Sequence, residues 1–439
     1  MTRSLHTART ATRHRLTWLV LAAIGALALL PTASLGATPA APGRTTASVQ
    51  STLAFAALKS DGSVVTWGDS GLGGDSSSVT SSLASGVNQV ISTTQAFAAL
   101  KNDGSVVTWG DANSGGDSST VASRLASGVV RIFAAGYAFA ALKNDGSVVT
   151  WGSINSGGNS SAVAGSLTSG VTRIFATTNA FAALKSDGSV VTWGSSSYGG
   201  DSTSVSASLA SGVAQISSTD SAFAAIKSNG SVVTWGNSSH GGNSTSVSGS
   251  LTSGVTQVFS TSQAFAALKS DGSVVTWGSN TYGGNSSTVS ASLTSGVTQI
   301  FSTDYAFAAL KTGGSVVTWG LYGGDSSTVA SRLTSGVTQI FATEYAFAAL
   351  KSDGSVVTWG ADGGDSSTVA SQLASGVTQI FSTASAFAAL KTDGSVVTWG
   401  TSGGNSSAVA SQLASGVAQV FATGAAFAAL KTDGSVVTW

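Results

Sequence analysis

The side chains of this 439-residue chain that could carry out chemistry are few. The sequence contains no cysteine, which excludes disulfides, thiolate zinc sites, iron–sulfur clusters and cysteine nucleophiles. Its three histidines are His6, His14 and His240, so only His240 lies beyond the first 36 residues. A Gly-Asp-Ser-Gly string at 68–71 could surround a serine nucleophile, but it occurs once and lies far in sequence from that histidine. A Ser-His-Asp triad is therefore not predicted.

Metal and phosphate sites are not predicted either. The recurrent G-G-D/N-S-S turns supply one carboxylate each, and several carry asparagine instead, at Asn159, Asn243, Asn285 and Asn405. A calcium ion needs several converging oxygen ligands, so a turn with at most one carboxylate is not expected to bind it. Neither G-x-x-x-x-G-K nor G-x-G-x-x-G occurs to hold a phosphate. We therefore expect a protein that is not an enzyme and has no cofactor.

The candidates that remain are side chains for recognition, and they lie in two kinds of loop. One loop precedes each A-F-A-A run and carries Tyr137, Tyr305, Tyr345 and the sole glutamate, Glu344. The other follows each T-W-G run and carries Tyr198, Tyr282, Tyr322 and His240. Tyrosine offers a large contact area at low entropic cost, so these eight residues are predicted to bind a partner. The alternative is sequence drift in exposed loops that nothing constrains.

These loops interrupt a repeat that fills most of the chain. The tryptophans of V-V-T-W are spaced by 42 residues from Trp67 to Trp319 and by 40 residues from there to Trp439, which gives ten units. One unit has a single small apolar face, so units must pack on each other. A fixed period of about 40 residues is typical of propellers and other repeat architectures.

Three strands are predicted in each unit. In the seventh unit they are 297–301, 306–310 and 316–319, short apolar, β-branched or aromatic runs bounded by turn residues. K-x-D-G-S joins the second strand to the third, and Asp-Gly is expected to supply the positive φ angles of a tight hairpin. The linking stretch 325–336 could form either a helical turn or a fourth, irregular strand.

Phenylalanine occupies two fixed positions in the units, and both are predicted to belong to the core. Ten of the 17 phenylalanines stand in A-F-A-A, and the other seven end the first strand. The pattern predicts an all-β fold, a β-propeller of ten 40–42-residue repeats. An open β-solenoid and a truncated repeat array are the alternatives.

The first 36 residues have the three-part pattern of a secretory signal peptide. Four arginines precede an apolar run at 18–30, and small residues follow Pro31, with cleavage expected between Gly36 and Ala41. A retained signal anchor is the alternative, although the run is short for a span. We expect a signal peptide at 1–36, a flexible linker at 37–46 and the repeat array at 47–439. The protein is then secreted or at the cell surface, with no membrane segment after cleavage.

Charge argues against nucleic acid as a partner. Beyond the four leader arginines the chain has 15 basic and 19 acidic residues, a net charge of −4. A basic surface for phosphates is therefore not expected.

The repeat resembles the regulator-of-chromosome-condensation family. The matching features are A-L-K-x-D-G-x-V-x-x-W-G, the V-x-x-I before the loop, and W-G-x-N-x-x-G at 277–283. The repeat is most similar to those of secreted bacterial members, such as the propeller-type β-lactamase inhibitory proteins. The family's Q-L-G is replaced here by G-D/N-S-S, and its proline in the linking stretch is absent.

The resemblance implies a seven-bladed propeller, whereas ten units are present. It also implies recognition through loop aromatics on one face, to which the six tyrosines correspond. The expected function is a secreted scaffold for protein–protein or surface recognition. A structural segment of a large cell-surface or matrix repeat protein is the alternative.

Overall fold

The computed structural model describes residues 45–51 and 53–439, and in these ranges the chain forms ten three-stranded antiparallel sheets. Each sheet is one repeat unit, called a blade below and numbered in chain order. The predicted all-β fold is confirmed. The predicted signal peptide and the linker up to residue 44 lie outside the described residues. The first strand of the array begins at Thr45, two residues before the expected start of the repeats.

The three strands of a blade lie side by side in sequence order. The first strands are β1 (Thr45–Gln50), β4 (Val87–Ser92), β7 (Val129–Ala134), β10 (Val171–Ala176), β13 (Val213–Ser218), β16 (Val255–Ser260), β19 (Val297–Ser302), β22 (Val337–Ala342), β25 (Val377–Ser382) and β28 (Val417–Ala422). The second strands are β2 (Ala54–Lys59), β5 (Ala96–Lys101), β8 (Ala138–Lys143), β11 (Ala180–Lys185), β14 (Ala222–Lys227), β17 (Ala264–Lys269), β20 (Ala306–Lys311), β23 (Ala346–Lys351), β26 (Ala386–Lys391) and β29 (Phe427–Lys431). The third strands are β3 (Val64–Gly68), β6 (Val106–Gly110), β9 (Val148–Gly152), β12 (Val190–Gly194), β15 (Val232–Gly236), β18 (Val274–Gly278), β21 (Val316–Gly320), β24 (Val356–Gly360), β27 (Val396–Gly400) and β30 (Val436–Thr438).

The hairpin between the second and third strands differs from the expected one. In blade 6 the N–H of Gly272 donates to the carbonyl oxygen of Lys269 at 2.9 Å, and Gly272 has φ +76°. Asp271 does not adopt a positive φ, so the expectation that both turn residues would do so was wrong. The five-residue K-x-D-G-S connection is long enough for an ordinary turn closed by one left-handed glycine. The carboxylate of Asp271 instead accepts hydrogen bonds from the N–H and Oγ of Ser273, at 2.9 and 2.6 Å.

The linking stretch is helical, which excludes the fourth strand. Short 3₁₀ helices, continued in some blades by an α turn, follow the Gly-Gly pairs of the linking stretches and lead to a buried leucine, such as Leu333 in the 3₁₀ helix Ser327–Leu333. The α-helices here are α1 (Thr80–Leu83), α2 (Ala122–Leu125), α3 (Ser206–Leu209) and α4 (Ala410–Leu413). The remaining 3₁₀ helices of these stretches are Ser77–Val79, Ser119–Val121, Ser161–Leu167, Thr203–Val205, Thr245–Leu251, Ser287–Leu293, Ser367–Val369 and Ser407–Val409.

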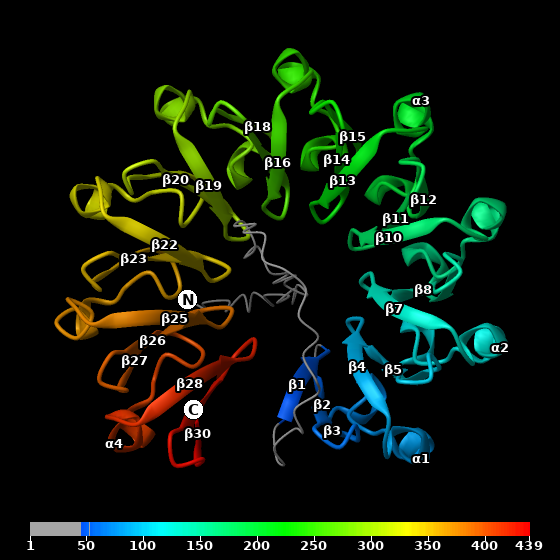
Figure 1. The fold of residues 1–439 in the computed structure, drawn as a ribbon, viewed down its shortest axis with the longest axis horizontal. Coiled ribbons are helices and arrows are strands. Elements are labelled where there is room, and N and C mark those ends of the chain that lie inside the picture. Colours follow the sequence, from blue (N-terminus) through cyan, green and yellow to red (C-terminus); the bar gives the residue numbers. More distant parts are fainter. Residues whose placement is uncertain (1–44, 52) are drawn as a thin grey trace, which may run out of the picture.

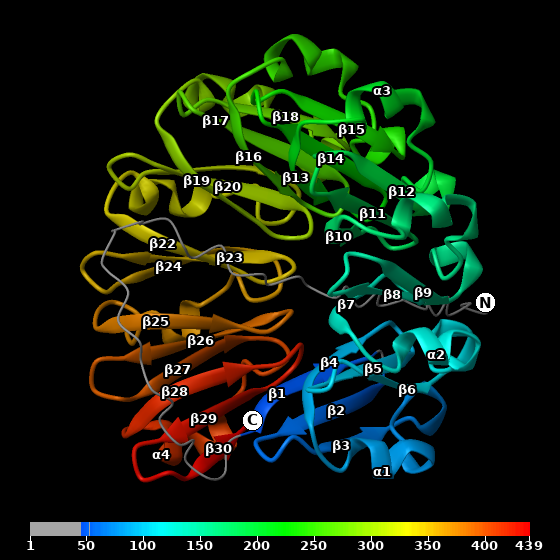
Figure 2. The same ribbon diagram turned by 45° about the vertical axis from the view of Figure 1, so that its right-hand side comes forward.

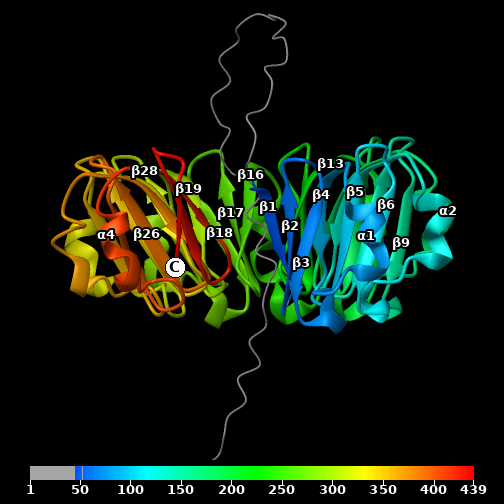
Figure 3. The same cartoon turned by 90° about the horizontal axis from the view of Figure 1, so that it is seen from below.

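The ten blades stand around a central axis as a propeller (Figure 1). The first strand of each blade lies nearest the axis and the helical turns lie at the outer rim, and the ring is a flat disc in the side view (Figure 3). Blade 1 and blade 10 face each other across one gap in the ring, which Figure 2 shows from an oblique direction. The open solenoid is therefore excluded.

Consecutive blades are joined by a repeated apolar core. Ala264, Ala266 and Leu268 of blade 6 face Phe307 and Trp319 of blade 7, and the other consecutive pairs use the equivalent residues. Within each blade the A-F-A-A phenylalanine stacks on the tryptophan of the neighbouring strand, with ring centroids 5.2–5.5 Å apart. Each blade thus packs its alanines against the next blade and its Phe–Trp pair against the preceding one.

The second set of phenylalanines is less buried than predicted. Phe133 is buried, but the equivalent residues in later blades are only half-buried, and Phe421 is 48% exposed. These side chains end the first strand, which borders the central opening (Figure 1). In the same strand Val297 and Ile300 are buried and so take the core positions. The core prediction was therefore right for the A-F-A-A position and wrong for most of the other.

The two ends of the array expose the faces that every internal blade buries. Trp67 of blade 1 is 47% exposed, whereas the equivalent tryptophans from Trp109 to Trp399 are 2–4% exposed. Val436 of blade 10 is 62% exposed, and no core cluster in the described residues joins blade 10 to blade 1. Nine interfaces therefore hold ten blades.

Candidate functional site

The variable loops all lie at one end of the blades, called the tyrosine face below. It consists of the loops between first and second strands and the loops between third strands and the Gly-Gly pairs. The two kinds meet because the start of the second strand pairs with the end of the third, as Ala306 pairs with Gly320. A threonine that recurs in most blades joins them: Thr261 Oγ1 donates to the carbonyl oxygen of Tyr282 at 2.9 Å.

The same threonine position holds the first kind of loop in shape. In blade 7, Thr303 Oγ1 accepts hydrogen bonds from the N–H groups of Tyr305 and Ala306, at 3.1 and 2.9 Å. Thr343 accepts the equivalent bonds from Tyr345 and Ala346. Buried threonines thus fix the backbone from which the variable side chains project.

Neighbouring blades are also tied through these loops. The N–H of Asp304 donates to the carbonyl oxygen of Glu344 at 3.0 Å, and the N–H of Glu344 donates to Ala384 at 2.9 Å. The same bond recurs from Thr94 of blade 2 to Gly424 of blade 10. Residues 40 or 42 positions apart in sequence are therefore adjacent on this face.

The second kind of loop changes shape between blades 6 and 7. In blade 6 it contains the 3₁₀ helix Asn280–Tyr282, while in blade 7 it is two residues shorter and reads Leu321-Tyr322. Tyr322 has φ +57° and is the only non-glycine residue with positive φ among the described residues. A bulky side chain in this conformation is strained, and such strain gathers at functional sites.

Four of the predicted tyrosines form one aromatic cluster, called the tyrosine cluster below. Tyr305 stacks on Tyr282 and on Tyr345, with ring centroids 4.9 and 5.2 Å apart. Tyr322 stands edge-on to Tyr305 and Tyr345, at 5.1 and 5.7 Å, and is 49% exposed. The cluster spans blades 6, 7 and 8.

Two tyrosines of the cluster, Tyr305 and Tyr345, have a raised pKa. Burial, followed by the neighbouring Tyr345, raises the pKa of Tyr305 to about 12. Burial also raises the pKa of Tyr345, and the carboxylates of Glu344, Asp304 and Asp362 add to this rise, although a hydrogen bond with Tyr305 opposes it. The cluster therefore combines aromatic rings, hydroxyl donors and nearby negative charge.

Three predicted residues lie away from the cluster. Tyr137 belongs to blade 3 and is partly exposed, and Tyr198 packs on the core between blades 4 and 5. His240 ends the 3₁₀ helix Ser238–His240 of blade 5, where its carbonyl oxygen accepts a hydrogen bond from Thr219 Oγ1 at 3.0 Å. The structure thus brings together Tyr282, Tyr305, Tyr322, Glu344 and Tyr345 and leaves Tyr137, Tyr198 and His240 apart.

Sequence reasoning missed three neighbours of the cluster. Asp304 and Asp362 act on the phenol groups, and Leu321 is 40% exposed beside Tyr322. All three lie in the variable loops, so a search of those loops for charge and exposed apolar residues could have found them.

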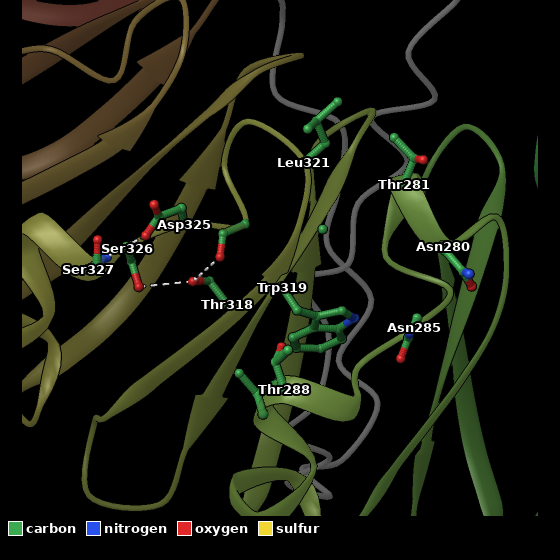
Figure 4. A pocket seen from close by; sticks show the side chains of 13 residues that line it. Asn280, Thr281, Asn285, Thr288, Thr318, Trp319, Leu321, Asp325, Ser326 and Ser327 are labelled. Carbon is green, nitrogen blue, oxygen red and sulfur yellow. Dashed lines mark hydrogen bonds between the residues drawn. The ribbon is translucent and has the colours of Figure 1, made fainter.

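A shallow groove of about 600 Å³ lies between blades 6 and 7 beside the cluster (Figure 4). Thr281 and Leu321, the sequence neighbours of Tyr282 and Tyr322, line one end of it. Elsewhere its lining is mainly polar: Asn280, Asn285, Thr288, Thr318, Asp325 and Ser326. The groove extends the contact surface from the cluster toward the rim.

The Gly-Asp-Ser-Gly string has a structural role. The carboxylate of Asp69 accepts hydrogen bonds from the N–H groups of Gly71 and Leu72, which caps the 3₁₀ helix Ser70–Leu72. Asp111 caps Ala112–Ser114 in blade 2, and the corresponding 3₁₀ helices in blades 3 and 4 are Ile154–Ser156 and Ser196–Tyr198. No group of three metal-ligating side chains occurs in the described ranges, and no helix there has the length and hydropathy to cross a bilayer.

The sequence of blade 6 matches a known repeat. Residues 255–283, which include β16, β17, β18 and Tyr282, match the regulator of chromosome condensation (RCC1) repeat. The resemblance to this repeat family is confirmed, and the ten blades of the array exceed the seven that it implied. No curated protein sequence matches the chain.

Several solved structures are similar to parts of the ten-blade array. Prp20p of Saccharomyces cerevisiae is 14% identical, with a TM-score of 0.32 over 54% of this chain and 72% of that one. Human WBSCR16 is 14% identical, with a TM-score of 0.31 over 74% and 78%. The ectodomain of the receptor kinase ACR4 of Arabidopsis thaliana is 16% identical, with a TM-score of 0.29 over 59% and 92%.

Proposed function

We propose that this RCC1-type propeller is a secreted, non-enzymatic scaffold that recognises a protein or surface partner through its tyrosine face. The single observation that supports it best is the convergence of Tyr282, Tyr305, Tyr322 and Tyr345 from two kinds of loop on three blades. Clustered tyrosines on a rigid framework are typical of recognition surfaces, because ordered aromatic side chains lose little entropy on binding. A partner contacts this face while the inter-blade cores stay intact.

Secretion is part of the proposal and rests on the leader sequence. The four arginines, the apolar run and the small residues that follow it support export and cleavage. Expression in a bacterium with a general secretion pathway should release a chain whose new amino terminus lies between residues 36 and 41. Retention of the intact chain in the membrane would contradict this part of the proposal.

Recognition is tested by capture of partners from the extracellular medium of the native host. The immobilised chain is compared with a Tyr282→Ala, Tyr305→Ala, Tyr345→Ala triple variant and with a Tyr137→Ala, Tyr198→Ala control. We expect the triple variant to lose a species that the parent and the control retain, while circular dichroism shows all three folded. Equal capture by the triple variant would show that binding lies elsewhere.

The second candidate, a structural segment of a cell-surface or matrix protein, is favoured by the near-identity of the nine interfaces. An array in which the same interface joins every pair of consecutive blades is long and stiff, and it needs no binding site for that role. In that case the triple variant would behave as the parent in every binding measurement.

A further inference from the structure

Charge is divided unevenly between the two ends of the blades. Each second strand begins at the tyrosine face and ends in lysine at the opposite end. These lysines are Lys59, Lys101, Lys143, Lys185, Lys227, Lys269, Lys311, Lys351, Lys391 and Lys431. The opposite end therefore carries one ammonium group for each blade, together with the hairpin aspartate that eight of the blades have two residues after the lysine.

The tyrosine face carries the other sign. Its described loops contain no lysine or arginine, and their acidic residues are Asp69, Asp111, Asp220, Asp304, Glu344 and Asp362. The ten lysines lie at the far end of the strands, where solvent screening limits their effect on this face. A one-signed face attracts partners of the opposite charge and speeds their encounter.

Three of the six carboxylates lie beside the tyrosine cluster. Asp304 and Glu344 directly precede Tyr305 and Tyr345, and Asp362 is close enough to act on Tyr345. Tyr322, half exposed, stands edge-on to Tyr305 and Tyr345, the two tyrosines on which these carboxylates act. Aromatic rings beside carboxylates suit a guanidinium group, which can stack on a ring and form paired hydrogen bonds to a carboxylate.

We propose that the tyrosine cluster binds an arginine-bearing segment of the partner protein, with the guanidinium group held between Tyr322 and the carboxylates of Asp304, Glu344 and Asp362. The proposal rests on the proposed function, since it names the partner's chemistry at the same site. Neutral and acidic partners are disfavoured because they would desolvate these carboxylates without compensation.

The test uses two immobilised peptides of the same Gly/Ser sequence, one with three arginines and one with three citrullines. Citrulline keeps the shape of arginine and removes its charge. Surface plasmon resonance should show the full chain binding the arginine peptide at least about tenfold more tightly, with affinity falling as salt rises. Equal binding to both peptides, or to neither, would overturn the proposal.

Charge variants locate the binding. We expect Asp304→Asn, Glu344→Gln, Asp362→Asn to weaken arginine-peptide binding about tenfold. The matched control Asp69→Asn, Asp111→Asn removes two carboxylates of the same face in blades 1 and 2 and should bind as the parent does. Equal losses in the two variants would show that the whole face, rather than the cluster, attracts the peptide and would overturn the proposal.

Failure of this inference is distinguishable from failure of the proposed function. If the tyrosine triple variant loses its captured partner and the charge variant keeps it, the recognition surface is right and the cationic partner is wrong. If the tyrosine triple variant also keeps its partner, the proposed function itself fails.

Discussion

The indole N–H of Trp193 donates a hydrogen bond of 3.0 Å to the carbonyl oxygen of Gly157, which lies 36 residues earlier in the preceding blade. The same bond is made by every equivalent tryptophan from Trp109 to Trp399. A buried carbonyl and a buried indole N–H thus satisfy each other across each of these interfaces.

Replacing Trp193 by Phe should destabilise the fold by about 1–3 kcal/mol, because it leaves the carbonyl oxygen of Gly157 without a partner and removes buried area. Urea unfolding followed by circular dichroism measures the change. Trp67→Phe is the control, since Trp67 is half exposed and its indole makes no such bond within the described ranges, and it should cost less than about 0.5 kcal/mol. Equal losses would mean that the inter-blade bond contributes nothing.

Gly157→Ala should be strongly destabilising, by at least about 2 kcal/mol, for two reasons. Gly157 has φ +91°, and a Cβ there would stand 2.7 Å from Cδ2 of Phe181. Gly165→Ala, in the 3₁₀ helix Ser161–Leu167, meets nothing within 4 Å and should stabilise by about 0.5–1 kcal/mol. Thermal denaturation of both variants tests the contrast, and a loss of stability in Gly165→Ala would contradict it.

Tyr322 offers a test of backbone strain. Alanine and glycine both remove its ring, but at φ +57° glycine should be the more stable of the two by about 1 kcal/mol. If the alanine variant is the more stable of the two, the backbone at this position is not strained and the prediction is contradicted. Both variants should bind the arginine peptide less tightly than the parent.

Alkaline pH should destabilise the protein partly through Tyr305. Its pKa rises from 10.0 to about 12 on folding, so the folded state favours the protonated phenol. This contribution is fully present below pH 10 and is lost as pH rises from 10 to about 12. Tyr305→Phe should therefore lose less stability over that range in urea unfolding at several pH values. An unchanged pH dependence would count against the raised pKa.

Fluorescence quenching can report the open end of the array. Among the described tryptophans, Trp67 is the only exposed one, so Trp67→Phe should remove most of the emission from the array that acrylamide quenches readily. Trp18 is present in both the parent and the variant, so its emission does not affect the comparison. If Trp67→Phe leaves the quenchable fraction unchanged, the faces of blades 1 and 10 are covered in solution.

The sequence predicted most of the fold because one period repeats throughout. Strands such as 306–310 were recognisable as short apolar runs bounded by turn residues, and the observed β20 is one residue longer. The first-strand phenylalanines were misplaced because a fixed register shows that a position is constrained, without showing which side of the strand it faces. The bond between Trp193 and Gly157 was invisible because it depends on how blades stack.

The candidate site was predictable in composition and not in geometry. Sequence variation between units singled out the tyrosines, but not which of them meet. Tyr305 reaches Tyr282 and Tyr345 because neighbouring loops are tied across blades, and Tyr322 joins them because its loop is two residues shorter. Tyr137 and Tyr198 satisfy the same sequence rule but lie outside the tyrosine cluster.

The identical interfaces make any blade a compatible neighbour for any other. Unequal recombination between the repeats of the gene can therefore add or remove a whole blade while keeping every junction between blades intact. Related genes should differ by multiples of one unit, and their loop residues should diverge independently of blade number. A lineage could thus gain a new recognition patch by copying one unit and then altering four or five codons, without redesigning the structure that supports it.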